Sequence, residues 1–81
     1  MLLEILTPEK KLFSGDVQGV QLPGIDGLFE VLDKHAPLVS ALGVGTVKVL
    51  QKGNPSETYA IQGGFVEVIN NKTTVLVEGV L

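Results

Sequence analysis

Apolar and polar residues alternate with a period of two along most of the chain. The clearest alternating segments are residues 20–22, 47–49, 66–68 and 75–78, and weaker ones are residues 3–6, 28–32 and 58–62. Side chains two positions apart share one face of a strand, so each segment can turn an apolar face to a core. The pattern predicts an all-β fold, a flattened antiparallel β-sandwich of about seven to ten short strands with no long helix.

Turn signals separate these segments. They fall at residues 23–27, 53–56 and 70–72. The pair Asn70-Asn71 is typical of a tight hairpin, because asparagine tolerates the left-handed conformation that such turns require. The pair Gly63-Gly64 interrupts a strand pattern and predicts a bulge or a close approach of two backbones.

Residues 36–42 are the only candidate for a helix. The segment is seven residues long, carries Pro37 at its second position and ends before Gly43. Proline and shortness both disfavour a stable helix. We therefore favour an ordered loop over one or two helical turns.

Composition restricts the functions that the chain can have. Its 81 residues make one small domain, residues 1–81, with no cysteine and one histidine, so disulfides, thiolate chemistry and a zinc site of the usual ligands are disfavoured. Nine acidic against six basic residues give a net charge of -3, which disfavours binding to nucleic acid. No segment is long and apolar enough to cross a membrane, and the acidic start is unlike a signal peptide. We expect a chain in the cytosol or docked on another component.

Catalysis has little support in the sequence. His35 lies five positions from Ser40 on a segment that contains a proline, and a catalytic triad requires a geometry that spacing alone does not establish. The acids Asp26, Glu30 and Asp33 cluster around one expected strand, where a solvated edge that discourages aggregation is the simpler interpretation. We expect no catalytic residues, no cofactor and no metal.

Two further motifs have a functional and a structural interpretation. Residues 43–46 begin like a dinucleotide-binding loop, but Lys48 stands where the third glycine belongs and a strand follows instead of a helix. Turn glycines before a strand explain this segment better. The order Asp33-Lys34-His35-Ala36, followed by residues 45–48, is similar to the lysine motif of lipoyl and biotinyl carrier domains. A swinging-arm carrier modified at Lys34 is therefore the alternative function.

Several stretches, taken in order, resemble the epsilon subunit of F-type ATP synthase. They are residues 6–10, 13–15, 20–24, the His35-Ala36-Pro37-Leu38 loop, residues 63–68 and residues 74–77. Each stretch is weak alone, but their order and spacing are specific, and the resemblance runs from about Leu3 to Gly79.

The resemblance implies a non-catalytic subunit of the central rotor. In the family, this domain holds the gamma subunit, rests on the polar loops of the membrane c-ring, and couples proton- or sodium-driven rotation to ATP synthesis without entering the membrane. The enzyme it implies lies on the cytoplasmic face of the cell membrane. Transferred by position, His35, Ala36, Pro37 and Leu38 fall at the gamma contact, and Asp26, Gly27 and Leu28 fall at the c-ring contact.

Three departures from the family concern these loops. The family usually has an acid at the position of Leu28, a glycine at that of Glu30, and often Pro-Gly at that of Asp33-Lys34. The first makes the expected c-ring contact more apolar, and the others affect local loop geometry. We expect Leu38→Asp to weaken gamma binding with the fold intact if Leu38 lies at the surface, and to unfold the domain if it lies in the core.

The family's C-terminal helical hairpin is missing from these residues. Most bacterial members continue into two helices that inhibit hydrolysis and in some cases bind ATP, so we expect neither property here. A short natural protein and a part of a longer one both fit. Three classes of function stay open from the residues alone: a rotor-coupling subunit, a swinging-arm carrier and a small ligand-binding sandwich.

Overall fold

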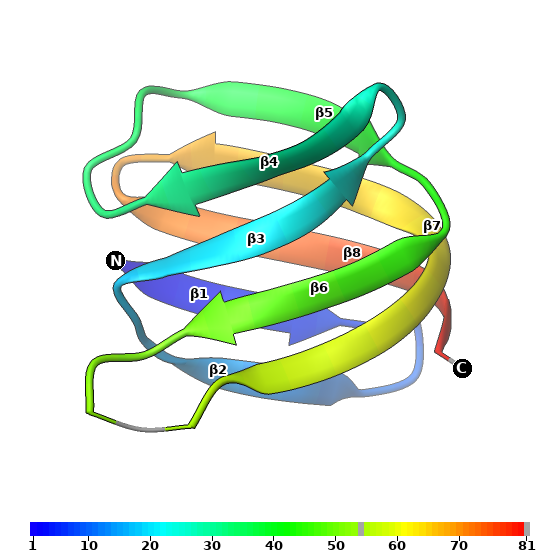
Figure 1. Cartoon of the computed structure of the whole chain (residues 1–81), viewed down its shortest axis with the longest axis horizontal. Coiled ribbons are helices and arrows are strands. Elements are labelled where there is room, and N and C mark those ends of the chain that lie inside the picture. Colours follow the sequence, from blue (N-terminus) through cyan, green and yellow to red (C-terminus); the bar gives the residue numbers. More distant parts are fainter. Residues whose placement is uncertain (54, 81) are drawn as a thin grey trace.

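The computed structural model describes residues 1–53 and 55–80, and these residues form eight β-strands and no helix (Figure 1). The strands are β1 (Leu2–Leu6), β2 (Lys11–Asp16), β3 (Gly19–Gly24), β4 (Gly27–Leu32), β5 (Leu38–Leu42), β6 (Gly45–Leu50), β7 (Glu57–Ile69) and β8 (Lys72–Val80). This confirms the all-β prediction. None of the described residues belongs to a helix that could cross a membrane.

The strands form one continuous sheet that folds over into two layers. One layer has the order β4-β3-β6 and then the first part of β7, and the other has β5, the second part of β7, and then β8-β1-β2. In Figure 1 the fainter strands β1, β2 and β8 lie behind β3, β4 and β6. The antiparallel prediction holds for every ladder among the described residues except β1 with β8, which is parallel. Parallel strands need a long connection, and here the rest of the domain supplies it.

The domain is not flattened, in contrast to the expectation. Its Cα extents are 26 × 25 × 23 Å. The physical reason lies in β7, whose thirteen residues belong to both layers. Residues 57–61 of this strand pair with β6, and residues 64–68 pair with β5 along the same edge, so the sheet turns a corner between them.

Two short strands were expected where β7 is continuous. The pair Gly63-Gly64 lies at the corner, and the predicted close approach is confirmed at Gly64. This residue has a φ of 155°, and a Cβ atom there would collide with the carbonyl oxygen of Leu76 on β8. A glycine therefore lets β7 bend without losing β8 as its neighbour.

Residues 38–42 form strand β5, so neither a loop nor a helix is correct there. Only Ala36 and Pro37 of the segment lie outside regular structure. The inner face of β5 carries its less exposed residues, Leu38, Ser40 and Leu42. In the ladder with β7, Leu38 pairs with Val68. A partner strand distant in sequence supplied the backbone hydrogen bonds that the local pattern did not indicate.

The turns follow the predicted chemistry in most places. Asn70 and Asn71 have φ values of 49° and 59°, which confirms the left-handed turn between β7 and β8. The turn between β3 and β4 is shorter than expected, with only Ile25 and Asp26 outside the two strands. The expected turn at residues 53–56 includes Asn54, which lies outside the described residues.

The core lies between the two layers and is rich in β-branched side chains. Its buried members are Met1, Leu3, Ile5, Val17, Val20, Leu22, Val31, Leu42, Val47, Val49, Ile61, Val66, Val68, Val75 and Val77. Each fully buried aliphatic side chain contributes about 1.5–3 kcal/mol relative to an exposed one. Because strands of both layers contribute to this one core, the loops at their ends are held in fixed relative positions.

Candidate functional site

The loop between β4 and β5 presents three of the four residues expected at the gamma contact. His35, Ala36 and Pro37 are exposed, whereas Leu38 is half-buried and packs against the core. The backbone N–H of His35 donates to the carbonyl oxygen of Leu32 at 3.1 Å, and Nδ1 of its ring lies 2.7 Å from the carbonyl oxygen of Ala36. The exposed surface of this loop is therefore residues 35–37, and Leu38 belongs to β5 and to the core, which is the alternative that the sequence left open.

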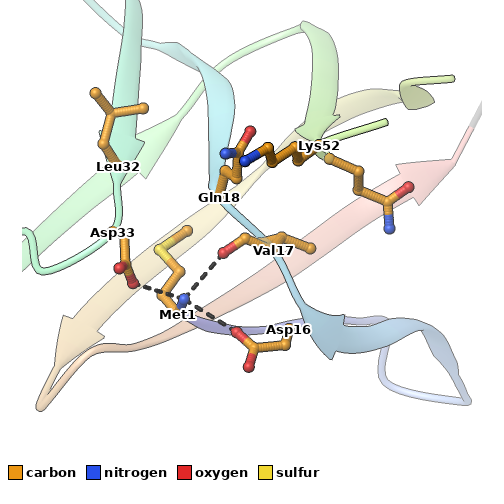
Figure 2. A pocket seen from close by; sticks show the side chains of 8 residues that line it. Met1, Asp16, Val17, Gln18, Leu32, Asp33 and Lys52 are labelled. Atoms are coloured by element: carbon orange, nitrogen blue, oxygen red, sulfur yellow. Dashed lines mark hydrogen bonds and ion pairs between the residues drawn. The ribbon is translucent and has the colours of Figure 1, made fainter. Parts of the chain in front are cut away.

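Asp33, at the start of this loop, is tied to the first residue of the chain. The α-ammonium group of Met1 donates to Oδ1 of Asp33 at 2.7 Å and to the carbonyl oxygen of Val17 at 2.9 Å, and it forms an ion pair with Oδ1 of Asp16 at 3.1 Å. Figure 2 shows these three oxygen atoms around the nitrogen. The side chain of Met1 itself is buried in the core. No sequence pattern indicated this cluster, because its members come together only in the fold.

Asn71, in the turn between β7 and β8, reaches the same loop from the other side. Its Oδ1 accepts a hydrogen bond from the backbone N–H of Lys34 at 2.7 Å, and its Nδ2 donates to Oδ1 of Asp33 at 3.1 Å. Lys34 has a φ of 64°, a left-handed conformation that is uncommon for a residue with a side chain. Glycine adopts such a conformation without strain. The backbone of the loop thus keeps a glycine-like shape although its residue is lysine.

The charges in this cluster perturb each other's protonation. Hydrogen bonding to Asp33 is the main reason why the pKa of the Met1 ammonium is raised, and burial opposes it. The same hydrogen bond, followed by that from Asn71, lowers the pKa of Asp33. Both shifts favour the ion pair near neutral pH.

A pocket of about 700 Å³ lies beside the Met1 cluster (Figure 2). Its polar lining includes Asp16, Asp33, Gln18 and Lys52. The Met1 ammonium already contacts both carboxylates, so it stands where a bound cation would otherwise pair with them. Among residues 1–53 and 55–80, no group of three potential metal ligands occurs, and no buried polar side-chain atom lacks a hydrogen-bond partner.

The residues expected at the c-ring contact lie at the turn between β3 and β4. Asp26 belongs to the turn, Gly27 and Leu28 are the first two residues of β4, and all three are exposed. Leu28 is 68% exposed and Ile25, beside it, is 69% exposed. A shallow hollow of about 610 Å³ lies between this turn and β5. Exposed apolar side chains that gather at one turn are typical of a contact surface.

Sequence reasoning did not single out two exposed apolar residues here, Val44 beside this turn and Ile25 within it. Val44, at the corner between β5 and β6, is 75% exposed. The adjacent Gly43 N–H donates to the carbonyl oxygen of Pro23 at 2.8 Å, so the corner is held against the end of β3. Ile25 lay within a segment that the sequence indicated only as a turn. No period-two pattern marks such residues, because both lie between strands.

The two candidate surfaces lie at opposite ends of β4. Strand β4 begins at Gly27, directly after the turn of residues 25–26, and ends at Leu32, directly before the loop of residues 33–37. Figure 1 shows the two connections at opposite sides of the domain. At about 3.3 Å per residue, the strand separates them by roughly 17 Å. The fold does not bring the two sets of residues together.

An apolar row crosses the outer face of the second layer. Ala41, Phe65, Leu76 and Leu6 are consecutive partners on β5, β7, β8 and β1. Phe65 and Leu76 are large and exposed. A hollow of about 350 Å³ beside them is lined by Leu6 and Pro8 among others. Sequence analysis did not single out these residues, and it expected Ala41 in a loop. Their alignment across four strands follows from the register of the ladders.

The remaining chemical candidates are dispersed or already engaged. The hydroxyl of Ser40 donates to the carbonyl oxygen of Ala41 at 3.3 Å, and the His35 ring contacts its own loop. Asp26 and Asp33 lie at opposite ends of β4, with Glu30 exposed on the strand between them. Gly43 lies in the corner between β5 and β6, and Gly45 is the first residue of β6. These placements agree with the structural interpretation of each motif.

Residues 1–81 match the family described as "ATP synthase, Delta/Epsilon chain, beta-sandwich domain". The chain belongs to this family. It is 45% identical over 78 residues to the ATP synthase epsilon chain of Chlorobium limicola, and the match covers 96% of this chain and 89% of that protein. It is 46% identical over 78 residues to the epsilon chain of Maridesulfovibrio salexigens, of which the match covers only 54%. The chain thus spans nearly all of one relative and about half of another.

Solved structures share the fold of this family member. A chain in the cryo-EM structure of the Euglena gracilis mitochondrial ATP synthase (OSCP/F1/c-ring) matches 98% of this chain and 51% of its own, with a TM-score of 0.88 and 21% identity. A chain in the central stalk and c-ring structure of the Tetrahymena thermophila mitochondrial ATP synthase matches 99% of this chain and 64% of its own, with a TM-score of 0.83 and 19% identity. Family membership replaces the carrier-domain alternative. Lys34 also lies between β4 and β5, which share no ladder among the described residues, whereas a carrier lysine needs a paired hairpin.

Proposed function

We propose that this chain is a non-catalytic central-stalk subunit of a proton- or sodium-driven F-type ATP synthase. In this role residues 1–81 act as one domain that links the gamma subunit to the polar loops of the c-ring and couples ring rotation to ATP synthesis. The domain lies at the cytoplasmic face of the membrane as a peripheral part of the enzyme. The names of its relatives and the assemblies in which its structural neighbours were solved support this proposal.

One geometric observation carries the proposal beyond the family name. A subunit that links two partners needs two separate surfaces on a body that does not deform. Residues 35–37 are exposed after the end of β4. Residues 25–28, the β3–β4 turn and the first two residues of β4, are exposed at its beginning. Strand β4 is paired with β3 over its whole length. The core behind β4 includes the fully buried Val31. Closely packed interiors deform little, so such a body transmits force between its two ends.

The gamma contact is tested at Ala36, which is exposed and outside regular structure. Ala36→Asp places a charge on the proposed surface without entering the core, so we expect a native fold and an affinity for gamma that falls about tenfold or more. Thr58→Asp is the control, since Thr58 is exposed on β7, away from this loop. Binding of each variant to the gamma subunit of the same enzyme is measured by calorimetry. Equal affinities for a folded Ala36→Asp variant and the wild type would remove residues 35–37 from the interface.

The c-ring contact is tested by two leucines on the outer face of the same strand. Leu28 and Leu32 are 68% and 52% exposed and lie at opposite ends of β4. We expect Leu28→Ser to weaken binding to the detergent-solubilised c-ring of the same enzyme and Leu32→Ser to leave it unchanged. The measurement is co-sedimentation of the gamma–epsilon complex with the ring. A weaker complex with Leu32→Ser than with Leu28→Ser would contradict the assignment of the turn.

A further inference from the structure

Among the described residues, the side chain of Asn71 is the one group of the β7–β8 turn that contacts the backbone of Lys34. Its Oδ1 accepts a hydrogen bond from the backbone N–H of Lys34, 37 positions away in the sequence, and its Nδ2 donates one to Asp33, 38 positions away. Its two amide atoms serve two adjacent residues of the β4–β5 turn. The backbone of Asn71 has a separate role, because its carbonyl oxygen accepts a hydrogen bond from the N–H of Leu2 at 3.2 Å.

The shape of the β4–β5 turn needs such external support. Lys34 has a φ of 64°, and a residue with a Cβ atom in the left-handed region costs about 1–2 kcal/mol. Strained backbone persists where surrounding contacts determine it more strongly than its own preference does. Asp33 is held by the Met1 ammonium, by Asn71 and by its own N–H, which donates to the carbonyl oxygen of Gln18 at 2.9 Å. Among the described residues, the hydrogen bonds of His35 reach only Leu32 and Ala36, so the direction of the loop follows from how Asp33 and Lys34 are held.

The chemistry at position 71 is specified twice. The turn requires a residue that tolerates a φ of 59°, which glycine, asparagine and aspartate do. The loop requires an acceptor for the Lys34 N–H and a donor to the Asp33 carboxylate. Glycine supplies neither group, and aspartate supplies an acceptor but places a second carboxylate beside Asp33. Only asparagine of the three meets both requirements.

We infer that Asn71 is a positioning residue for the exposed surface of residues 35–37. It acts through the Lys34 amide and the Asp33 carboxylate and keeps the loop in the orientation that meets the partner. The inference rests on the proposed function for the identity of that partner, the gamma subunit. Its structural half, the control of Lys34 by Asn71, stands independently of that identity.

The test compares glycine at two adjacent positions of one turn. Asn71→Gly keeps a residue suited to positive φ and removes the side-chain amide. Asn70→Gly is the matched control, since Asn70 has a φ of 49° and its side chain has no hydrogen bond to the loop in the described part of the chain. Two quantities are measured for each variant: the hydrogen-exchange rate of the Lys34 amide by NMR, and the affinity for gamma by calorimetry. Asn71→Asp, which suits the same turn, is a second variant in case the glycine turn does not fold.

We expect Asn71→Gly to accelerate exchange of the Lys34 amide and to lower the gamma affinity about five- to tenfold, the effect of one or two lost hydrogen bonds. Asn70→Gly should match the wild type in both. We expect Asn71→Asp to keep the Lys34 amide protected but to lower the gamma affinity, because the second carboxylate repels Asp33.

The outcomes separate the inference from the proposed function. Unchanged exchange at Lys34 in Asn71→Gly would overturn the inference. Accelerated exchange with unchanged gamma affinity would also overturn it if Ala36→Asp does weaken binding, because the loop would then be an interface that needs no anchoring. If Ala36→Asp has no effect either, the control of Lys34 by Asn71 stands and the proposed gamma surface is wrong.

Discussion

Substitution of Gly64 by alanine tests how the long strand β7 turns the corner of the sheet. Gly64 has a φ of 155°, and the Cβ atom of an alanine would collide with the carbonyl oxygen of Leu76 and lie 3.1 Å from the Cα atom of Val77. All of these atoms belong to backbone, so no flexible side chain can move aside. The β7–β8 ladder, which continues past this point from Gly63 to Ile69, must therefore separate locally.

The expected cost follows from two independent contributions. Residues in sparsely populated backbone regions cost about 1–3 kcal/mol, and overpacking of a tight site costs about 1–3 kcal/mol. The reduced flexibility of the unfolded chain offsets about 0.4–1 kcal/mol of this. The free energy of unfolding should fall by roughly 3 kcal/mol, which is a large part of the total stability of a small domain. At about 4–8 °C for each kcal/mol, the melting temperature should fall by about 10–25 °C.

Gly63→Ala is the matched control at the neighbouring residue. A Cβ atom at Gly63 would lie 3.5 Å from the carbonyl oxygen of Leu42, an ordinary contact distance. This variant should keep its stability or gain up to about 1 kcal/mol. Urea unfolding followed by circular dichroism measures both variants. A fall of less than about 0.5 kcal/mol in the free energy of unfolding of Gly64→Ala, or an equal fall in Gly63→Ala, would refute the predicted backbone collision.

Three further predictions concern the β4–β5 loop. Lys34→Gly should raise the free energy of unfolding by up to about 1 kcal/mol, measured in urea, because glycine adopts a φ of 64° without strain. The free energy of unfolding should fall as pH rises through the raised pKa of the Met1 ammonium, above its ordinary value near 8. It should also fall as pH decreases through the lowered pKa of Asp33. Thermal melts from pH 3 to 10 should show both pH dependences weakened in Asp33→Asn. Leu38→Asp should lower the melting temperature, because the half-buried side chain of Leu38 packs on the core. An unchanged melting temperature would show that Leu38 is a surface residue.

Local sequence determined most turns, the class of fold and all of the strands except β2 and β5. Period-two alternation is a property of neighbouring residues, so it identified the buried face of β6 before any fold was known. The tolerance of asparagine for positive φ identified the left-handed turn at Asn70 and Asn71 in the same way. The order of several family motifs determined the family, which residues 1–81 match. The same reasoning singled out His35 and Leu28, and both are exposed: His35 lies in the β4–β5 loop and Leu28 at the start of β4.

Tertiary structure decided everything that depends on partners distant in the chain. β5 became a strand because β7 supplies its ladder, β7 stayed continuous because Gly64 lets it bend against β8, and β1 joined β8 in parallel. The contact of Asn71 with Lys34 belongs to the same class, since 37 residues separate them. Backbone hydrogen bonds and side-chain contacts of this kind depend on which segments meet in space, and no local pattern encodes that meeting.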